Sequence, residues 1–350
     1  MRILEKKIKS KQNIHLNGDD FANLQNLISG LYSPNKTFFG ERKYKSFISA
    51  NKSNETIPIL LYVKKSFIFE KGKSTNLCFN RKIVGEITNE EFFKVENKKI
   101  IKKTFNFVNR KHPIIKKILL KNPYCLSGKI KINKNFIKSF YNDLKKIQKN
   151  NLKNSVAFSS RNIPHLGHEK IIQRLIKMKF KNIFIVYINS KFNYCNYDLF
   201  KRCYKIISKK FKKKFYFINL FLPSFKAGPN EALFQSMIIK KIGIQNFSIG
   251  RDHAGISNFY KRYESQDFLS KRKIKRFNFI FNHEPVKCEI CKKIFFDDNN
   301  SYCKGKHNCK KNMVFFSGKK NISLLRNNNF KKLSKYINKD IINELKKINF

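Results

Sequence analysis

Apolar and amphipathic segments alternate regularly between residues 155 and 250. Four short apolar runs predict strands, at 156–158, 183–188, 215–221 and 247–249. Three intervening segments have helical spacing of apolar residues, at 168–178, 198–209 and 229–242. Strict alternation of strand and helix predicts a parallel sheet that is covered by helices on both faces.

The pattern before this region is different. Short apolar runs such as 57–63 are separated by turn-rich stretches such as 32–35, so we expect a small β-rich unit with a few helices. A polar segment rich in Lys and Asn, 145–154, precedes the change of pattern. We therefore divide the chain into three parts, 1–150, 151–285 and 286–350.

Composition adds little about partners. The 350 residues include 76 Lys+Arg and 23 Asp+Glu, a formal net charge of +53, and such a balance ordinarily indicates nucleic acid or an anionic membrane. Here Lys, Asn, Ile and Phe dominate every stretch and Trp is absent, as a codon pool rich in A and T would produce. The basic residues are also spread evenly along the chain, so a nucleic-acid partner is not expected.

The N-terminal residues lack the pattern of a signal peptide, and no apolar run approaches the ~20 residues that cross a bilayer. We expect a soluble, unprocessed, cytoplasmic protein with no membrane partner. Half of the eight Cys lie near the C-terminus, a clustering that indicates a metal site more than a disulfide framework.

The segment 159–168 follows the first strand of the alternating region and is chemically dense. Ligands of parallel sheets bind beyond the carboxyl ends of the strands. His165, Gly167 and His168 form an H-x-G-H pattern, in which Gly admits a phosphate to the helix N-terminus and two imidazoles donate to a leaving pyrophosphate. Arg161 adds a planar fork for a tetrahedral oxyanion. The alternative is a chance coincidence of two His and a Gly.

A second dense loop, 250–255, follows the fourth strand. Gly250 and Gly255 allow close backbone approach, and Arg251 and His253 offer cationic or donor groups. Alternatively, Arg251 and Asp252 form a surface pair, with His253 a structural histidine. The Gly-Pro pair at 228–229 marks a further helix start that could bind an anion.

These motifs together resemble the ATP sulfurylases (sulfate adenylyltransferases). That family has Gln-x-Arg-Asn-Pro followed by H-x-x-H, which Arg161, Asn162, His165 and His168 match in register. Residues 250–255 match its Gly-Arg-Asp-His-Ala-Gly without a change, and 227–232 resemble its Ala-Gly-Pro-Arg-Glu-Ala. Residues 28–41, 259–266 and 316–318 carry further similarities, so the resemblance covers nearly the whole chain.

The resemblance implies an α/β protein in three parts: a β-rich PUA-like N-terminal domain, a Rossmann-like H-x-G-H nucleotidyltransferase domain, and a small zinc-bound C-terminal region with helices. It implies conversion of ATP and sulfate to adenosine 5'-phosphosulfate and pyrophosphate, or the reverse. The similarity is to the zinc-containing bacterial type without a kinase domain, with Mg²⁺ accompanying ATP. It also suggests a homodimer.

The site residues that the resemblance implies fall into three overlapping sets. The catalytic set is Ser160, Arg161, Asn162, His165 and His168. The ATP-binding set is Ser159, Ser160, Arg161, Asn162, His165, His168, Gly250, Arg251, Asp252, His253 and Val286. The sulfate-binding set is Ser159, Arg161, Arg251 and Ala254. The implied mechanism is direct in-line attack by a sulfate oxygen on the α-phosphorus, without a covalent enzyme intermediate.

Four positions depart from the family pattern. Ser159 stands where Gln is usual, which implies weaker sulfate binding, and Ile163 stands where Pro is usual, with Pro164 one position later. Lys319 replaces a usual Thr and Ile322 a usual Arg, so one triphosphate-binding group is missing unless Lys319 or Lys320 substitutes as a point charge.

The C-terminal cysteines predict a zinc site independently of the family. Cys288 and Cys291 form a C-x2-C pair, and Cys303 with either His307 or Cys309 supplies two further ligands of a tetrahedral structural site. The family resemblance favours Cys288, Cys291, Cys303 and His307, because its zinc-containing members have Cys-x3-His in the second half.

Two other functions remain open on the sequence. One is a different nucleotidyltransferase of the same fold, against which the loop 250–255 argues. The other is a non-catalytic homologue that binds RNA through its basic surface, which Ser159, Lys319 and Ile322 keep open.

Overall fold

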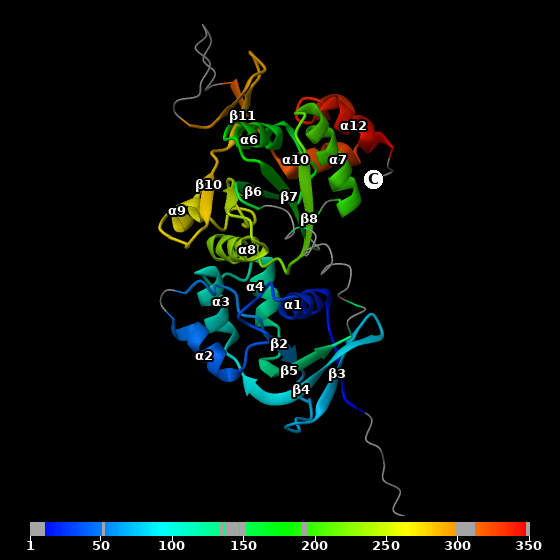
Figure 1. The fold of residues 1–350 in the computed structure, drawn as a ribbon, viewed down its shortest axis with the longest axis vertical. Coiled ribbons are helices and arrows are strands. Elements are labelled where there is room, and N and C mark those ends of the chain that lie inside the picture. The colour runs from blue at the N-terminus through cyan, green and yellow to red at the C-terminus, as the bar shows by residue number, and fades with distance from the viewer. Residues whose placement is uncertain are drawn as a thin grey trace, which may run out of the picture. The chain divides into compact units, whose positions relative to one another are not determined.

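The computed structural model describes residues 11–50, 53–133, 136, 147, 152–190, 193, 195–298 and 312–347. The chain divides into two compact units, residues 1–146 and 147–350. Figure 1 shows the first unit in blue to cyan and the second in green to red.

The first unit is built on one mixed sheet. Its strands are β1 (Asn13–His15), β2 (Leu61–Val63), β3 (Ser74–Phe79), β4 (Lys82–Lys94) and β5 (Tyr124–Ile132), in the order β1-β3-β4-β5-β2. Its helices are α1 (Gly18–Ile28), α2 (Glu41–Ser49), α3 (Asn97–Phe105) and α4 (Pro113–Leu119). The apolar run 57–63 pairs as a strand only over its last part, because Pro58 lacks the N–H that a ladder needs.

The second unit contains the predicted parallel sheet. Its strands are β6 (Ser155–Ser160), β7 (Asn182–Asn189), β8 (Phe215–Phe221), β9 (Asn246–Ile249) and β10 (Asn278–Phe281), in the order β10-β9-β6-β7-β8 with every pair parallel. The four strands expected from the sequence are confirmed. The edge strand β10 was not expected, because its apolar run, Asn-Phe-Ile-Phe, is only four residues long and resembles many other short runs of this Phe- and Ile-rich chain.

Helices cover this sheet on both sides, as the alternation predicted. They are α6 (Leu166–Lys177), α7 (Tyr197–Lys210), α8 (Pro229–Ile242) and α9 (Glu264–Ser270). In Figure 1, α6 and α7 lie on one side of the sheet and α8 and α9 on the other. Alternate side chains of β7 point to opposite faces of the sheet. Ile183 and Ile185 belong to the core under α6 and α7, and the fully buried Phe184 and Val186 point to the opposite face.

The C-terminal segment completes the second unit. A small antiparallel sheet, in the order β12-β11-β13, is formed by β11 (Pro285–Cys288), β12 (Ile294–Phe296) and β13 (Met313–Phe315). The last helices are α10 (Gly318–Arg326), α11 (Phe330–Leu333) and α12 (Lys339–Lys346). Ile341 and Leu345 of α12 pack in the same apolar core as α7, and Arg202 Nε of α7 pairs with Glu344 Oε1 at 2.7 Å.

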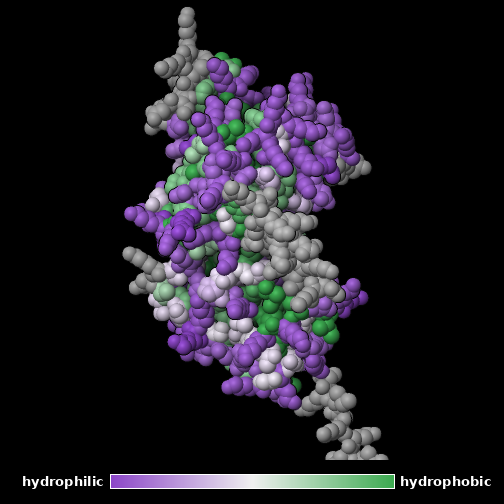
Figure 2. Space-filling view, in the orientation of Figure 1, coloured by the Kyte–Doolittle hydropathy of each residue, from purple (hydrophilic) through white to green (hydrophobic). Residues whose placement is uncertain are grey.

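The visible surface is largely hydrophilic (Figure 2), as the Lys-rich composition requires. None of the described helices is both long and apolar enough to cross a membrane.

Candidate active site

The candidate site lies where the strand order of the parallel sheet reverses. β6 pairs with β7 on one side and with β9 on the other, and loops that leave such a point diverge and open a crevice. A cavity of about 250 Å³ lies there. It is lined by every predicted ATP- and sulfate-binding residue except one, namely by Ser159, Ser160, Arg161, Asn162, His165, His168, Gly250, Arg251, Asp252, His253 and Ala254. The exception, Val286, is fully buried on β11 beside Pro285, which does line the cavity.

His165 and His168 are fixed by the start of α6. The backbone N–H of His168 donates to His165 Nδ1 at 3.3 Å, and the backbone N–H of His165 donates to His168 Nδ1 at 3.4 Å. This reciprocal pair is a capping box made by imidazoles. Because each Nδ1 accepts a hydrogen bond, each neutral ring carries its own proton on Nε2.

Burial keeps both rings neutral. It lowers the pKa of His168 to about 4, and it holds the pKa of His165 well below the usual range, with further contributions from His168 and Arg251. The rings stack with centroids 3.8 Å apart, a contact that two imidazolium ions would oppose. The pair therefore offers two fixed, uncharged Nε2–H donors.

Gly167 is required here for packing. A β-carbon at Gly167 would lie 2.8 Å from Phe316 Cδ2 and 3.0 Å from His165 Cε1. The Phe316 ring stacks on His165 with centroids 5.1 Å apart. The sequence assigned this glycine to phosphate approach, whereas the structure shows a requirement set by two aromatic neighbours.

Arg161 and Asn162 present polar groups without protein partners. Within the described part of the chain, the Arg161 guanidinium has no hydrogen bond or ion pair, and Asn162 Oδ1 is buried and unbonded. The late motif contacts this residue, since a β-carbon at Gly318 would lie 2.7 Å from Asn162 Nδ2. Both side chains are thus available to a ligand in the cavity.

The loop 250–255 is held by α8 and by its own backbone. His253 Nε2 lies 3.1 Å from Gln235 Oε1, and burial with help from Arg161 lowers the pKa of His253 to about 4. Asp252 and Ala254 have left-handed backbones, with φ of 48° and 60°. A β-carbon at Gly255 would lie 2.1 Å from Asp252 Oδ1, so this glycine allows the loop to close on Asp252.

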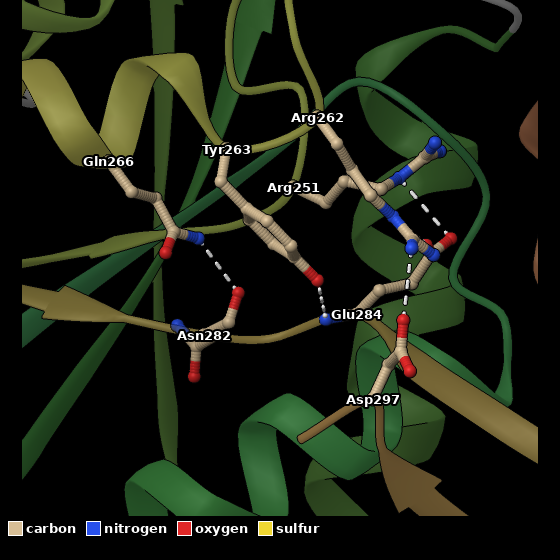
Figure 3. Close-up of polar contacts among 7 residues, drawn as sticks. All are labelled: Arg251, Arg262, Tyr263, Gln266, Asn282, Glu284 and Asp297. Atoms are coloured by element: carbon tan, nitrogen blue, oxygen red, sulfur yellow. Dashed lines mark hydrogen bonds and ion pairs between the residues drawn. The ribbon is translucent and has the colours of Figure 1, made fainter. Parts of the chain in front are cut away.

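Glu284, which sequence reasoning missed, holds Arg251 in place. Arg251 Nε lies 3.2 Å from Glu284 Oε1, and Arg262 Nε donates to Glu284 Oε2 at 2.9 Å. Arg262 Nη1 also pairs with Asp297 at 2.9 Å. Figure 3 shows the two guanidinium groups converging on the Glu284 carboxylate. The predicted anion-binding arginine is therefore held in one orientation, although its side chain is 42% exposed.

Asn282 anchors the end of β10 beside this ion-pair group. Gln266 Nε2 of α9 donates to Asn282 O at 2.8 Å (Figure 3), and Asn282 Nδ2 donates to Ser248 Oγ of β9 at 2.9 Å. Arg174 of α6 donates to Asn282 Oδ1 at 2.9 Å. Buried hydrogen bonds thus connect both helix layers to the strand that leads into Glu284.

Lys226 and Glu231 also line the cavity, and the sequence motifs gave neither a role. Lys226 is 3% exposed and Glu231 is 1% exposed. Lys226 lies just outside the motif 227–232, and Glu231 lies inside it, where sequence analysis gave the segment only as a helix start that could bind an anion.

Lys320, one of the two lysines that could substitute for the missing triphosphate-binding group, is not among the residues that line the cavity. Lys320 donates to the Tyr336 hydroxyl at 3.0 Å and lies over the same ring. Ile322 is 9% exposed and packs in the apolar core. Ser317 caps α10 by accepting from the Lys320 N–H at 3.3 Å. The side chain of Lys319 is outside the description.

Half of the predicted zinc ligands can be placed. Cys288 is fully buried at the end of β11, and Cys291 lies half-buried in the turn that leads to β12. Cys303, His307 and the competing Cys309 lie outside the described residues. Within the described ranges, no group of three or more His, Cys, Asp or Glu side chains is placed to hold a metal ion.

Family comparisons match both units. Residues 142–347, more than half of the chain, match the family model described as ATP-sulfurylase. Residues 1–135 match the model of a PUA-like domain. The expected architecture, a PUA-like domain followed by a nucleotidyltransferase domain of this type, is confirmed.

Several curated proteins are similar along most of their length. The sulfate adenylyltransferase of Pyrococcus abyssi is 26% identical over 77% of this chain and 74% of that protein. The sulfate adenylyltransferases of Carboxydothermus hydrogenoformans and Ignicoccus hospitalis are 29% and 27% identical, over 69% and 82% of this chain and 68% and 80% of theirs. Among solved structures, the hexameric APS kinase from Thiobacillus denitrificans has a TM-score of 0.63 at 13% identity, over 96% of this chain and 62% of that one. This last likeness concerns the fold alone.

Proposed function

Because the chain belongs to the ATP-sulfurylase family, we propose that it is a sulfate adenylyltransferase, which forms adenosine 5'-phosphosulfate and pyrophosphate from ATP and sulfate, or ATP in reverse. The observation that carries this proposal is that both motif loops line one cavity at the reversal point of the sheet. Proteins named sulfate adenylyltransferase match most of the chain, which gives the proposal its substrates.

Sulfate binding is assigned to the charged side of this cavity. Arg161, which has no protein partner among the described residues, and Arg251, oriented by Glu284, would hold the anion together with the Ala254 N–H and Ser159. Sulfate is a dianion at neutral pH and has no proton to lose. Its oxygen can therefore attack the α-phosphorus of MgATP without a general base, and the reaction depends on positioning and on charge stabilisation.

The histidines and Asn162 are assigned to the phosphates. As the new P–O bond to sulfate forms, the bond between the α-phosphorus and the bridging oxygen breaks, and the electron pair leaves on pyrophosphate. The Nε2–H groups of His165 and His168 would donate to oxygens on which this charge develops. Ser160, Gly250, Asp252 and His253 are assigned to ATP, and Val286 would contribute through its main chain, since its side chain is fully buried.

A structural zinc ion is part of the proposal, held by Cys288, Cys291, Cys303 and His307. Two described features support it. Cys288 N–H donates to Lys293 O at 3.0 Å, which closes the hairpin that carries both near cysteines. Glu289 N–H donates to Asn312 O at 2.9 Å, so the chain after residue 311 returns to this hairpin. Thiolate and imidazole ligands suit zinc, and the ion would stabilise the segment that leads to Phe316 and Gly318.

We also propose a homodimer that works in the cytoplasm. The homodimer is supported by the family resemblance, and the compartment by cysteines that suit a reducing environment. Light scattering of the purified protein tests the dimer, for which a mass of about twice the 41.6 kDa of one chain is expected.

Enzyme assays test the function and the site together. Purified protein should form ATP from adenosine 5'-phosphosulfate and pyrophosphate, and should release pyrophosphate from MgATP when sulfate is added. Arg161→Ala or His168→Ala should lower the rate at least ~10²-fold, the scale for loss of a charge-stabilising group. The exposed Arg326 and His15 provide matched control variants, Arg326→Ala and His15→Ala.

Inactive wild-type protein would contradict the proposed function. Full activity in both site variants would contradict the site assignment while leaving the function in place.

A further inference from the structure

Lys226 is a buried lysine in the wall of the cavity. It stands five residues after the end of β8 and is 3% exposed, and a lysine is almost never buried unless other charges lie nearby. The cavity that it lines is the one that holds Arg161, Arg251 and Ala254. These are the residues that the proposed function assigns to sulfate.

The turn that carries Lys226 is fixed against the loop 250–255. The N–H of Gly228 donates to Ala254 O at 3.2 Å, and the N–H of Ala227 donates to Glu231 Oε2 at 3.0 Å. Lys226 itself has a left-handed backbone, with φ of 58°, a conformation that favours glycine. A long cationic side chain at such a position indicates that the side chain is used.

Both cationic and acidic side chains lie around this turn. Burial and, to a smaller extent, repulsion by Arg161 lower the pKa of Lys226 to about 8, against the opposite effect of Glu231 and Asp252. Two cations that face one cavity repel each other until an anion lies between them. A dianion such as sulfate would remove this repulsion and bind to both.

The short side chain of Ser159 explains why a lysine would be useful at position 226. The family pattern has the longer Gln at this position, and the Ser hydroxyl reaches less far into the same cavity. An ammonium group on a four-carbon stem supplies the missing reach and adds a charge.

We propose that Lys226 binds the sulfo group of sulfate and of adenosine 5'-phosphosulfate, sharing this anion with Arg161. The inference rests on the proposed function for the identity of the substrate, and on the cavity itself for the presence of an anion site.

Kinetics of Lys226→Met test the inference. Loss of a charge-assisted hydrogen bond should raise the KM for sulfate about 10- to 100-fold, and the KM for adenosine 5'-phosphosulfate should also rise. The KM for ATP in the forward reaction should stay near its wild-type value. Lys241→Met, which removes the same charge from an exposed position of the helix that follows Lys226, should change none of these values.

A double variant separates anion binding from simple neutralisation of Glu231. If Lys226 only balances the buried Glu231 carboxylate, Lys226→Met combined with Glu231→Gln should restore the sulfate KM, and that outcome would overturn the inference. We expect the sulfate KM of the double variant to stay high.

A binding measurement keeps the inference independent of turnover. Sodium sulfate should raise the Tm of the wild type more than sodium chloride at equal ionic strength. Lys226→Met should show a smaller difference, since only the general stabilisation by sulfate remains, and Lys241→Met should keep the full difference. Lys226→Gln replaces the Met variant if that protein fails to fold. Wild-type protein that is stabilised through Lys226 but makes no ATP would contradict the proposed function alone, whereas equal sulfate shifts in wild type and variant would overturn the inference.

Discussion

The arrangement of His165 and His168 suits fixed hydrogen-bond donors, because one nitrogen of each ring caps the helix start and the other is left to carry the proton. Nδ1 accepts a backbone N–H of the helix start, and this leaves the proton on Nε2. Burial then opposes protonation of the second nitrogen. A neutral donor suits a reaction in which charge moves onto pyrophosphate and no proton has to be exchanged with the enzyme.

Ser159→Gln should lower the KM for sulfate several-fold, since the longer amide can reach the anion with one more hydrogen bond of about 1 kcal/mol. The gain should be larger when Lys226→Met is also present, because both groups would serve one anion. Steady-state kinetics with varied sulfate measure both effects. A sulfate KM that does not fall in either background would show that Ser159 does not face the anion.

Glu284→Gln should raise the sulfate KM roughly 10-fold, because the charged partner that orients Arg251 becomes a neutral amide. Asp297→Asn is the matched control, since Asp297 pairs with Arg262 and not with Arg251 in the described contacts (Figure 3). Sulfate and ATP KM values should be measured for both variants. Equal effects of the two would mean that the ion-pair group acts only through stability.

The candidate site is formed by the ends of strands and the starts of helices. The residues of the site lie at the ends of β6 and β9 and at the starts of α6, α8 and α10, where backbone groups are free to turn toward a ligand. The start of α6 is also the point at which Phe316, from the C-terminal segment, packs on the histidine pair.

Gly167→Ala should disturb the start of α6 and lower the rate of ATP formation at least ~10-fold, because the added methyl would push the His165 ring or Phe316 out of place. The control is Gly18→Ala at the start of α1, where nothing lies within 4 Å of the new β-carbon. Its Tm and activity should stay at the wild-type level. Wild-type activity in Gly167→Ala would show that the contact with Phe316 can relax.

The buried histidines make the stability of the second unit depend on pH. His165, His168 and His253 have folded-state pKa values below that of an exposed histidine, about 6.5. Above that pH the three rings are unprotonated in both the folded and the unfolded state. Below it the rings become protonated in the unfolded chain but stay neutral in the folded protein. The free energy of unfolding should therefore fall as the pH drops from about 6.5 toward 4, by up to about 1.4 kcal/mol per pH unit for each ring.

Urea unfolding at several pH values measures this loss. A triple variant with Asn at the three histidine positions should lose most of the dependence in this window. An equally steep decline in that variant would assign the effect to other groups.

Metal content tests the architecture of the C-terminal region. Purified protein should contain about one zinc per chain, and Cys288→Ser should lose the metal and lower the Tm, because the ion supplies binding energy that little apolar burial can replace. Cys195→Ser, a half-buried cysteine elsewhere in the unit, should keep the zinc.

The fourth ligand is tested by a further pair of variants. His307→Ala should release the zinc and Cys309→Ser should retain it. The reverse result would make Cys309 the ligand, and a metal-free protein of full stability would reject the site.

The sequence determined the elements and the residues at their ends. Periodicity located β6 to β9 and the helices between them, because local spacing of apolar residues depends only on which face is buried. Motif spacing picked out the histidine pair and the loop 250–255, which the structure brings to one cavity. The short strand β10 was missed, because a run of four residues, even with three apolar ones, does not distinguish a strand from other short apolar stretches.

Tertiary structure alone decided which distant side chains meet. Lys226 follows β8, Glu284 follows β10 and Phe316 precedes α10, and no spacing along the chain connects them to Arg161, Arg251 or His165. Lys226 and Glu284 meet the motif loops because parallel strands end at one sheet edge, and β13 of the antiparallel sheet leads Phe316 to the same place. Burial and neighbouring charges then set the properties of each group. The neutral state of the histidines was also decided by the tertiary structure, since it follows from burial and from backbone partners that exist only in the folded chain.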